Sequence, residues 1–258
     1  MKKNQLRGKR IISSKVVLIG IVVLVLLVLT GFKVYVDNGY KAIHELDYFK
    51  LTEPVTVSET DNLISVLPVS KSDKNVGLIF YGGERINKEC YYPLMMELAA
   101  KGYYCYLPTT FGNLPILNIE GAEFVIRKYP DIKEWYIIAH SQSCEIAAKY
   151  AKGHTKSLTG LVYLGGYSLK HDLSPFDLKL LSIHGSRDTV FNLELFKKAK
   201  QNDPKNSTYQ VINGGNNTGF ADCRILKKDT EATINIREQV QETAKMIDEF
   251  INNSKEEK

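Results

Sequence analysis

The chain has few of the residues from which metal, disulfide and redox sites are built. Its 258 residues include four cysteines and five histidines. Neither set shows the close spacing of metal ligands, and a chain long enough to bury a large core does not need a disulfide scaffold. A glycine-rich phosphate loop is also missing. The sequence therefore predicts no metal and no bound cofactor. A single bridge stays open as a hypothesis, since Cys90 and Cys223 both fall in predicted loops.

The chain outside its N-terminus has no excess of basic residues over acidic ones. Residues 1–15 hold six basic residues and no acid, whereas the remaining chain has 28 basic and 29 acidic residues. The formal charge of +5 therefore belongs to the N-terminal tail, and the rest of the chain is nearly neutral. Because nucleic acids are bound through large basic patches, this distribution predicts no nucleic-acid partner.

A long apolar run follows the basic tail. Residues 16–32 carry no charged side chain, and if Lys33 reaches the membrane surface the apolar stretch continues to residue 36. As a helix, this stretch would be about 31 Å long, enough to cross the hydrocarbon core. A buried core helix would not be apolar on all sides next to a cationic tail. A cleaved signal peptide would have a shorter apolar region and a small-residue cleavage motif. We expect an uncleaved signal anchor over residues 16–36 in the cell membrane. Residues 1–15 would lie in the cytoplasm and the following domain outside it.

Residues 53–252 have the pattern of one α/β domain. Short apolar strands, such as residues 76–81, alternate with amphipathic helices, such as residues 91–101. This alternation is typical of a mostly parallel sheet with helices on both faces, whose functional residues lie at the carboxyl ends of the strands. Residues 37–52 are predicted to form a juxtamembrane helix or stalk, and residues 253–258 a polar tail.

Ser141 stands between a predicted strand, residues 135–139, and a predicted helix, residues 144–152. Ala139 and Ser143 on either side of it are small, as the sharp turn that exposes a nucleophilic serine requires. A serine that only caps the helix is the alternative. His140 comes directly before Ser141, and we expect its side chain to point away from the nucleophile because neighbouring residues alternate between the two faces of a strand.

Two further loops at predicted strand ends contain residues that suit catalysis. Asp188 lies one loop beyond a late strand, where a carboxylate can orient a histidine, although aspartate is also common in turns. Gly82 and Gly83 follow the first long apolar strand, and such glycines allow a backbone N–H to face a developing oxyanion. A simple tight turn is the alternative for these glycines.

The order of Ser141 and Asp188 on successive strand ends resembles the α/β-hydrolase superfamily, in which a serine, an acid and a histidine follow one another. Over roughly residues 53–252 the sequence is similar to its small lidless branch, the alpha/beta hydrolase fold-5 type. The resemblance implies that Ser141 is the nucleophile and Asp188 the acid. It implies an oxyanion hole formed by the backbone N–H groups of Gln142 and of Gly83 or its neighbour, and a small-molecule or lipid ester as substrate.

Asn217 is the main departure from this family. The motif at residues 214–217 matches the family's Gly-Gly-Asn-His except at its last position, and Phe220 also keeps its place. Asparagine cannot take a proton from serine near pH 7, and losing the histidine of a serine hydrolase costs on the order of a million-fold in kcat. Of the other histidines, His171 is the candidate replacement base because its loop, residues 165–179, is expected to lie over the catalytic end of the sheet.

Two functions follow from these patterns. The first is a membrane-anchored serine hydrolase that cleaves esters through an acyl-Ser141 intermediate. The alternative is a catalytically inactive hydrolase-fold protein that binds ligands or acts as a scaffold at the outer membrane face. The loop at residues 165–179 has no room for an inserted lid, so an open site is expected in either case.

Overall fold

The computed structural model describes residues 14–49, 51 and 53–256. The predicted basic tail, residues 1–15, therefore lies almost wholly outside the described residues, and so do the last two residues of the predicted polar tail. The chain divides into two compact units, of which the first ends at Asn38 and the second begins at Gly39.

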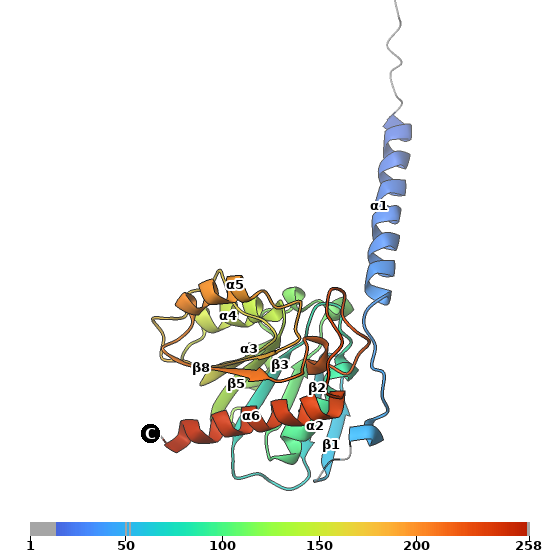
Figure 1. Ribbon diagram of the computed structural model, residues 1–258. Coiled ribbons are helices and arrows are strands. Elements are labelled where there is room, and N and C mark those ends of the chain that lie inside the picture. Colours follow the sequence, from blue (N-terminus) through green and yellow to red (C-terminus); the bar gives the residue numbers. More distant parts are fainter. Residues whose placement is uncertain (1–13, 50, 52, 257–258) are drawn as a thin grey trace, which may run out of the picture. The chain divides into compact units, whose positions relative to one another are not determined.

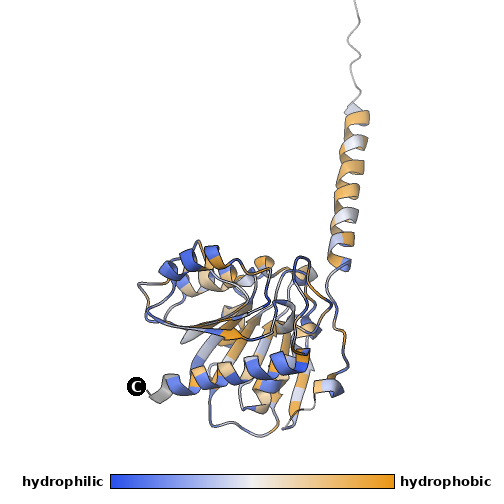
Figure 2. Cartoon of the chain, in the orientation of Figure 1, coloured by the Kyte–Doolittle hydropathy of each residue, from blue (hydrophilic) through white to orange (hydrophobic). Residues whose placement is uncertain are grey.

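The first unit is a single long helix, α1 (Ser14–Asp37). Its most apolar window has a mean hydropathy of 2.8 with no part buried, and Figure 2 shows apolar colours along most of its length. Among the described residues it is the one helix long and apolar enough to cross a membrane. The predicted N-terminal apolar helix is thus confirmed, and a signal sequence would meet the same criteria of length and composition.

The second unit is built on an eight-stranded sheet with the order β1-β2-β4-β3-β5-β6-β7-β8. The β1–β2 and β2–β4 pairs are antiparallel, and all other pairs are parallel. This confirms the predicted mostly parallel sheet. The strands are β1 (Val55–Glu59), β2 (Leu63–Pro68), β3 (Val76–Tyr81), β4 (Tyr104–Pro108), β5 (Glu134–His140), β6 (Gly160–Leu164), β7 (Lys179–Gly185) and β8 (Asn206–Ile212).

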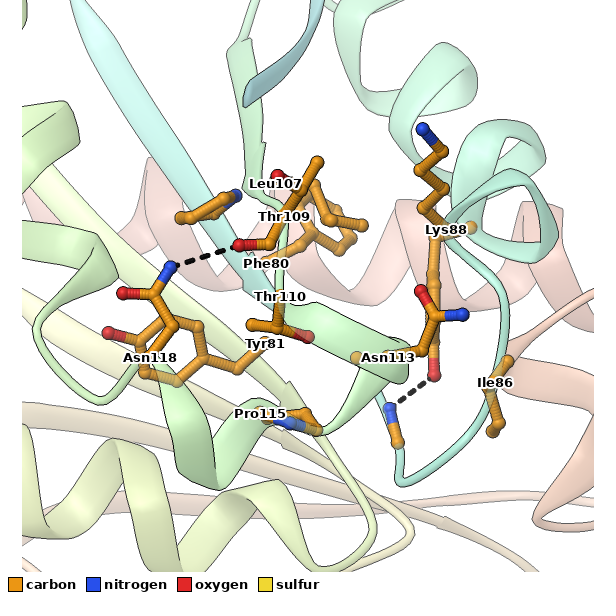
Figure 3. A pocket seen from close by; sticks show the side chains of 14 residues that line it. Phe80, Tyr81, Ile86, Lys88, Leu107, Thr109, Thr110, Asn113, Pro115 and Asn118 are labelled. Carbon is orange, nitrogen blue, oxygen red and sulfur yellow. Dashed lines mark hydrogen bonds between the residues drawn. The ribbon is translucent and has the colours of Figure 1, made fainter. Parts of the chain in front are cut away.

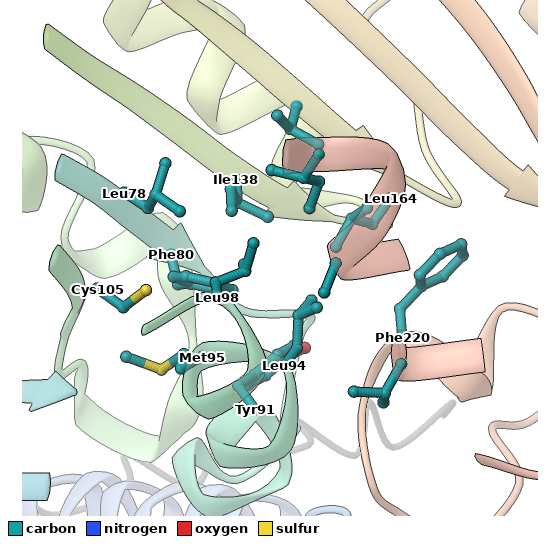
Figure 4. Packing of buried hydrophobic residues seen from close by; sticks show 14 of the residues in the cluster. Leu78, Phe80, Tyr91, Leu94, Met95, Leu98, Cys105, Ile138, Leu164 and Phe220 are labelled. Carbon is teal, nitrogen blue, oxygen red and sulfur yellow. The ribbon is translucent and has the colours of Figure 1, made fainter. Parts of the chain in front are cut away.

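Helices cover both faces of the sheet (Figure 1). On one face, α2 packs mainly on β2 and β4, and α6 on β7 and β8. Leu94 and Leu98 of α2 belong to the same buried cluster as Leu78 of β3 and Ile138 of β5 (Figure 4). Because β3 has helices on both sides, all six of its residues are buried, which explains its unbroken apolar sequence. The helices are α2 (Tyr92–Ala100) and α6 (Ile236–Glu256) on this face, and α3 (Gly121–Lys128), α4 (Ser143–Gly153) and α5 (Leu193–Ala199) on the other.

The segment from Gly39 to Phe49, predicted as part of a stalk, packs on the domain. Tyr40 forms a β-bridge with Ile86, and Ala42 forms one with Cys223. The segment ends in a short 3-10 helix, η1 (Leu46–Phe49), whose last side chain is fully buried. We call residues 39–49 the strap. Isolated bridges have no sequence period, so the pattern of residues could not predict this docking.

Helix α3 begins at Gly121, and a side chain from the sheet holds its first turn. The hydroxyl of Tyr81 donates to the carbonyl oxygen of Ile119 at 2.5 Å and accepts from the backbone N–H of Ala122 at 3.0 Å. A side chain from β3 therefore fixes the start of α3, a contact that residue periodicity does not reveal.

Candidate active site

Ser141 occupies a strained turn between β5 and α4. Its φ is +55°, a left-handed conformation that costs a non-glycine residue about 1–3 kcal/mol. Two hydrogen bonds hold the turn: the Ser141 N–H donates to the Leu164 carbonyl at 2.8 Å, and the Ser143 hydroxyl donates to the Gly82 carbonyl at 2.5 Å. The N-cap position of α4 is Gln142, not Ser141, and no side chain caps it. The turn therefore presents the serine instead of using it as a cap.

Two glycines after β6 let the next loop approach this turn. A Cβ atom on Gly166 would overlap the carbonyl oxygen of Ser141 and the sulfur of Cys144. Gly165 has a φ of +57°, and a Cβ atom there would overlap the side-chain amide of Asn217. Larger residues at either position would push apart the elements that carry Ser141 and Asn217.

Ser141 opens into a cavity of about 590 Å³ at the carboxyl ends of the strands. This volume lies within the range of small-molecule binding sites, roughly 300–1,000 Å³. Apolar side chains from three separate loops line it, including Ile116, Leu169 and Val190, and the acids Glu84 and Glu145 also face it. The cavity can therefore hold an apolar group beside the serine hydroxyl.

A second hollow lies nearby, between the loops after β3 and β4 (Figure 3). Its volume is about 20 Å³, and Asn118 closes one side by donating to the Thr109 carbonyl at 3.1 Å. A space of this size holds about one water molecule. The larger cavity is therefore the candidate substrate site.

Asp188 is partly removed from solvent and well supplied with hydrogen-bond donors. One carboxylate oxygen accepts the backbone N–H groups of Val190 at 3.0 Å and Phe191 at 2.8 Å, and the other accepts the side-chain amide of Asn217 at 2.8 Å. Burial raises the pKa of Asp188 to about 6, while these hydrogen bonds act in the opposite direction. Asp188 therefore both closes its own turn and contacts residue 217.

Asn217 is completely buried, and its amide is committed to partners. The amide nitrogen donates to Asp188 at 2.8 Å and to the Gly165 carbonyl at 2.9 Å, and the amide oxygen accepts from Nε2 of His140 at 3.0 Å. The structure thus places Asn217 against the acid, where the resemblance places a histidine. The amide reproduces the N–H that such a histidine would give to Asp188, but it supplies no base for Ser141.

His140 continues the chain of hydrogen bonds on the opposite face of the sheet. Its ring packs against Tyr91 and Phe220, away from the cavity. The Gly83 N–H donates to the Tyr91 hydroxyl at 2.5 Å, so that hydroxyl donates to Nδ1 of His140 at 2.8 Å. Burial lowers the pKa of His140 to about 4, so the ring is neutral. We call the series Gly83, Tyr91, His140, Asn217 and Asp188 the buried polar chain.

The backbone N–H groups that the resemblance implies for an oxyanion hole do not all lie at the cavity. The Gly83 N–H is bonded to Tyr91 inside the protein, whereas its neighbour Glu84 lines the cavity. Gln142, the residue after Ser141, also lines the cavity. Of these residues, the structure therefore brings Gln142 and Glu84 to the candidate site, and Gly83 to the buried polar chain.

The predicted replacement base His171 lies beside Glu145, with 4.0 Å between its Nε2 and the carboxylate. Glu145 lines the cavity and accepts backbone N–H groups of the same loop, those of Leu169 at 2.7 Å and Lys170 at 3.2 Å. Among the residues that the structure describes, none makes a hydrogen bond to the Ser141 hydroxyl. His171 therefore lies behind Glu145, which itself lines the cavity. No basic side chain of the described residues is hydrogen-bonded to the Ser141 hydroxyl.

No cluster of three or more His, Cys, Asp or Glu side chains that could hold a metal ion occurs within residues 14–49, 51 and 53–256.

The sequence model of the alpha/beta hydrolase family matches residues 77–241, more than half of the chain, and the chain belongs to this family. Two solved structures share its fold. One is described as a predicted CIB-like hydrolase from Thermoplasma acidophilum, with 13% identity and a TM-score of 0.54 over 75% of this chain and 99% of that one. The other is MGS-MChE2, an alpha/beta hydrolase enzyme from the metagenome of lagoon sediments at Mar Chica, Morocco, with 12% identity and a TM-score of 0.56 over 78% of this chain and 99% of that one. No curated protein matches the sequence significantly.

Proposed function

We propose that this chain is a membrane-anchored serine hydrolase that cleaves ester bonds slowly through an acyl-Ser141 intermediate. The observation that carries the proposal is the strained φ of +55° at Ser141, next to a cavity of about 590 Å³. A strained residue persists only where the surrounding structure enforces it, and such residues gather at functional sites. Here Leu164, Ser143 and Gly166 enforce it.

In the proposed reaction the Ser141 oxygen attacks the ester carbonyl. The backbone N–H of Gln142 stabilises the oxyanion, the alcohol leaves, and water then hydrolyses the acyl-serine. Because Asn217 cannot accept the serine proton, solvent takes it, and rate enhancement comes from binding and the oxyanion donor. Hydrolases that lack part of their triad retain about 10³–10⁴-fold acceleration over water from these sources.

A second candidate function is ligand binding without catalysis. The observation that favours it is the commitment of every polar atom of the Asn217 amide to Asp188, Gly165 and His140. This residue is fixed as a structural bridge between the acid and the opposite face of the sheet. A protein that only binds an acyl ligand would need the cavity but no base.

Labelling with a fluorophosphonate probe separates the two functions. A serine hydrolase should form a covalent adduct with the probe, and mass spectrometry of the digest should locate it on Ser141. The variant Ser141→Ala should remain unlabelled, and Ser157→Ala, which changes an exposed serine outside the turn, should still give an adduct on Ser141. Absence of an adduct on the folded protein, under conditions that label an ordinary esterase, would leave ligand binding as the function.

We further propose that α1 is an uncleaved anchor and that residues from Gly39 onward lie outside the cytoplasm. The 24-residue length of α1, its apolar surface and the six basic residues before residue 16 support this arrangement. In intact cells, protease added from outside should digest the domain, and the protein should stay in membranes washed with alkaline carbonate. A mature chain that has lost residues before the domain would instead identify a cleaved signal sequence.

A further inference from the structure

Cys90 and Cys223 come from distant parts of the sequence and lie on neighbouring segments that the strap contacts. Cys90 lies in the 3-10 helix η2 (Lys88–Tyr91), and Cys223 lies shortly after the 3-10 helix η6 (Thr218–Phe220). The backbone N–H of Asp222 donates to the carbonyl oxygen of Cys90 at 2.7 Å. This hydrogen bond brings the two stretches of backbone directly side by side.

The two side chains also influence each other. The neighbouring Cys223 thiol, together with burial, raises the pKa of Cys90. Both residues are free cysteines and both are buried, with 1% of Cys90 and 6% of Cys223 exposed. A disulfide needs Cα atoms about 4.4–6.8 Å apart and side chains that face each other. The hydrogen bond from Asp222 to Cys90 places the two cysteines on adjacent backbone segments, as such a bridge requires.

The strap contacts both cysteines. The Cys90 sulfur lies 3.6 Å from the carbonyl oxygen of Tyr40, and Ala42 pairs with Cys223 in an antiparallel bridge. Cys223 also lines a separate cavity of about 390 Å³ together with His44 and Asp222. A small molecule that enters this cavity therefore reaches a wall that Cys223 helps to form.

We infer that Cys90 and Cys223 form a redox-active pair that a disulfide donor, such as oxidised glutathione or a protein disulfide, converts into an intramolecular disulfide. The Cys223 thiolate attacks a donor sulfur and releases one donor thiol. The Cys90 thiolate then attacks Cys223 in the mixed disulfide and releases the second. The two protein thiols are oxidised, the donor disulfide is reduced, and the two cysteine protons end on the two donor thiols. This modification lies outside the proposed hydrolase reaction and does not depend on it.

The bridge would join the two segments that supply Tyr91 and Asn217 to the buried polar chain. Cys90 is followed by Tyr91, which bonds His140, and Cys223 follows the η6 helix that begins after Asn217. It would also secure the strap where it crosses these two segments. Because the loop from residue 90 to residue 223 is long, closing it restricts the unfolded chain strongly.

The other two cysteines provide matched internal controls. Cys105 and Cys144 are as buried as Cys90, but the hydrogen-bond partners of their sulfur atoms are main-chain oxygens, those of Tyr103 and Ala139. They should therefore remain thiols under conditions that oxidise the pair.

The experiment uses the full-length protein in detergent with oxidised glutathione, followed by alkylation, trypsin and mass spectrometry. Two outcomes support the pair: a cross-linked peptide containing residues 89–101 and 206–224, and a thermal midpoint about 4–16 °C higher than that of the reduced protein. Cys90→Ser and Cys223→Ser should each abolish the cross-link and the shift, whereas Cys105→Ser should retain both.

Access of the donor is tested separately by refolding the denatured protein in a glutathione redox buffer. A cross-link that forms only on refolding still supports the pair and places its formation before the strap docks. Stable glutathione adducts on Cys90 or Cys223, or alkylation of both in the folded and the refolded protein, would overturn the inference. Bridges to Cys105 or Cys144 would overturn it as well.

Discussion

The side-chain amide of Asn217 donates a hydrogen bond of 2.8 Å to the carboxylate of Asp188. Asp188 therefore accepts an N–H from residue 217, as it would from the imidazole of a histidine at that position. The opposite end of the amide accepts from His140, so the same residue ties the acid to the far face of the sheet. Asn217 therefore links the acid at the cavity to the buried histidine behind it.

Asn217→His should raise esterase activity. An imidazole at this position can donate its Nδ1–H to Asp188 where the amide now does, and its Nε2 can then serve as the base for Ser141. General base catalysis contributes about 10²–10⁴-fold, so kcat/KM for a p-nitrophenyl ester should rise by this factor. His140 would lose the amide oxygen but keep the main-chain oxygen of residue 217, which lies 3.2 Å from its Nε2.

The control is the double variant Asn217→His with Ser141→Ala, which should show no gain. A folded Asn217→His protein with unchanged turnover would show that the missing base alone does not explain low activity.

Gly166→Ala should damage the strained turn. The new Cβ would overlap the carbonyl oxygen of Ser141, so the turn or the loop must move. We expect the free energy of unfolding to fall by about 1–3 kcal/mol, as overpacking usually costs, together with loss of fluorophosphonate labelling. Gly153→Ala is the matched control, since no atom lies near its Cβ and alanine favours the helix. Equal labelling of the two variants would contradict the role of Gly166.

His140 should make stability depend on pH. Its pKa is lowered from 6.5 to about 4 by burial, so between these values the unfolded chain binds a proton that the folded protein does not. Stability from this residue is therefore present above pH 6.5 and falls as the pH drops, by about 3 kcal/mol at pH 4 and below. His140→Gln keeps an acceptor for Tyr91 and a donor for Asn217 but does not titrate.

Denaturant unfolding of wild type and His140→Gln between pH 4 and 8 measures this effect. Their difference in free energy of unfolding should grow up to about pH 6.5 and then remain constant. Asp188, whose pKa burial raises to about 6, contributes with the opposite sign, but it is present in both proteins and cancels. A difference that does not change with pH would contradict a neutral, buried His140.

The apolar cavity should favour longer acyl chains. Each buried methylene contributes about 0.8 kcal/mol, so KM should fall roughly four-fold per methylene until the cavity is filled. Ile116→Glu, at a residue that is 58% exposed beside Ser141, should flatten this trend. Ile43→Glu is the control. Ile43 is 57% exposed, but it belongs to the strap and lines the separate cavity there. An equal effect of both substitutions would place the acyl group elsewhere.

Much of the fold was predictable from local patterns. Unbroken apolar strands such as β3 and the amphipathic spacing of Val240, Ala244, Ile247 and Ile251 on α6 reflect burial on one or two faces, and burial leaves a period in the sequence. The turn at Ser141 was predictable for a similar reason, because a tight strand–helix turn limits the size of nearby side chains. The docking of the strap through Tyr40 and Ala42 was not, since isolated bridges leave no period.

The sequence by itself determined the identity of the chemical groups: a serine, an acid, an asparagine in place of histidine, and one apolar helix. Only the tertiary structure decided how those groups are used. Asn217 joins Asp188 to His140, the Gly83 N–H is bonded to Tyr91, and Cys90 lies beside Cys223. The physical reason is that hydrogen bonds and contacts between distant segments depend on how sheet, helices and loops pack, which the spacing of residues along the chain does not specify.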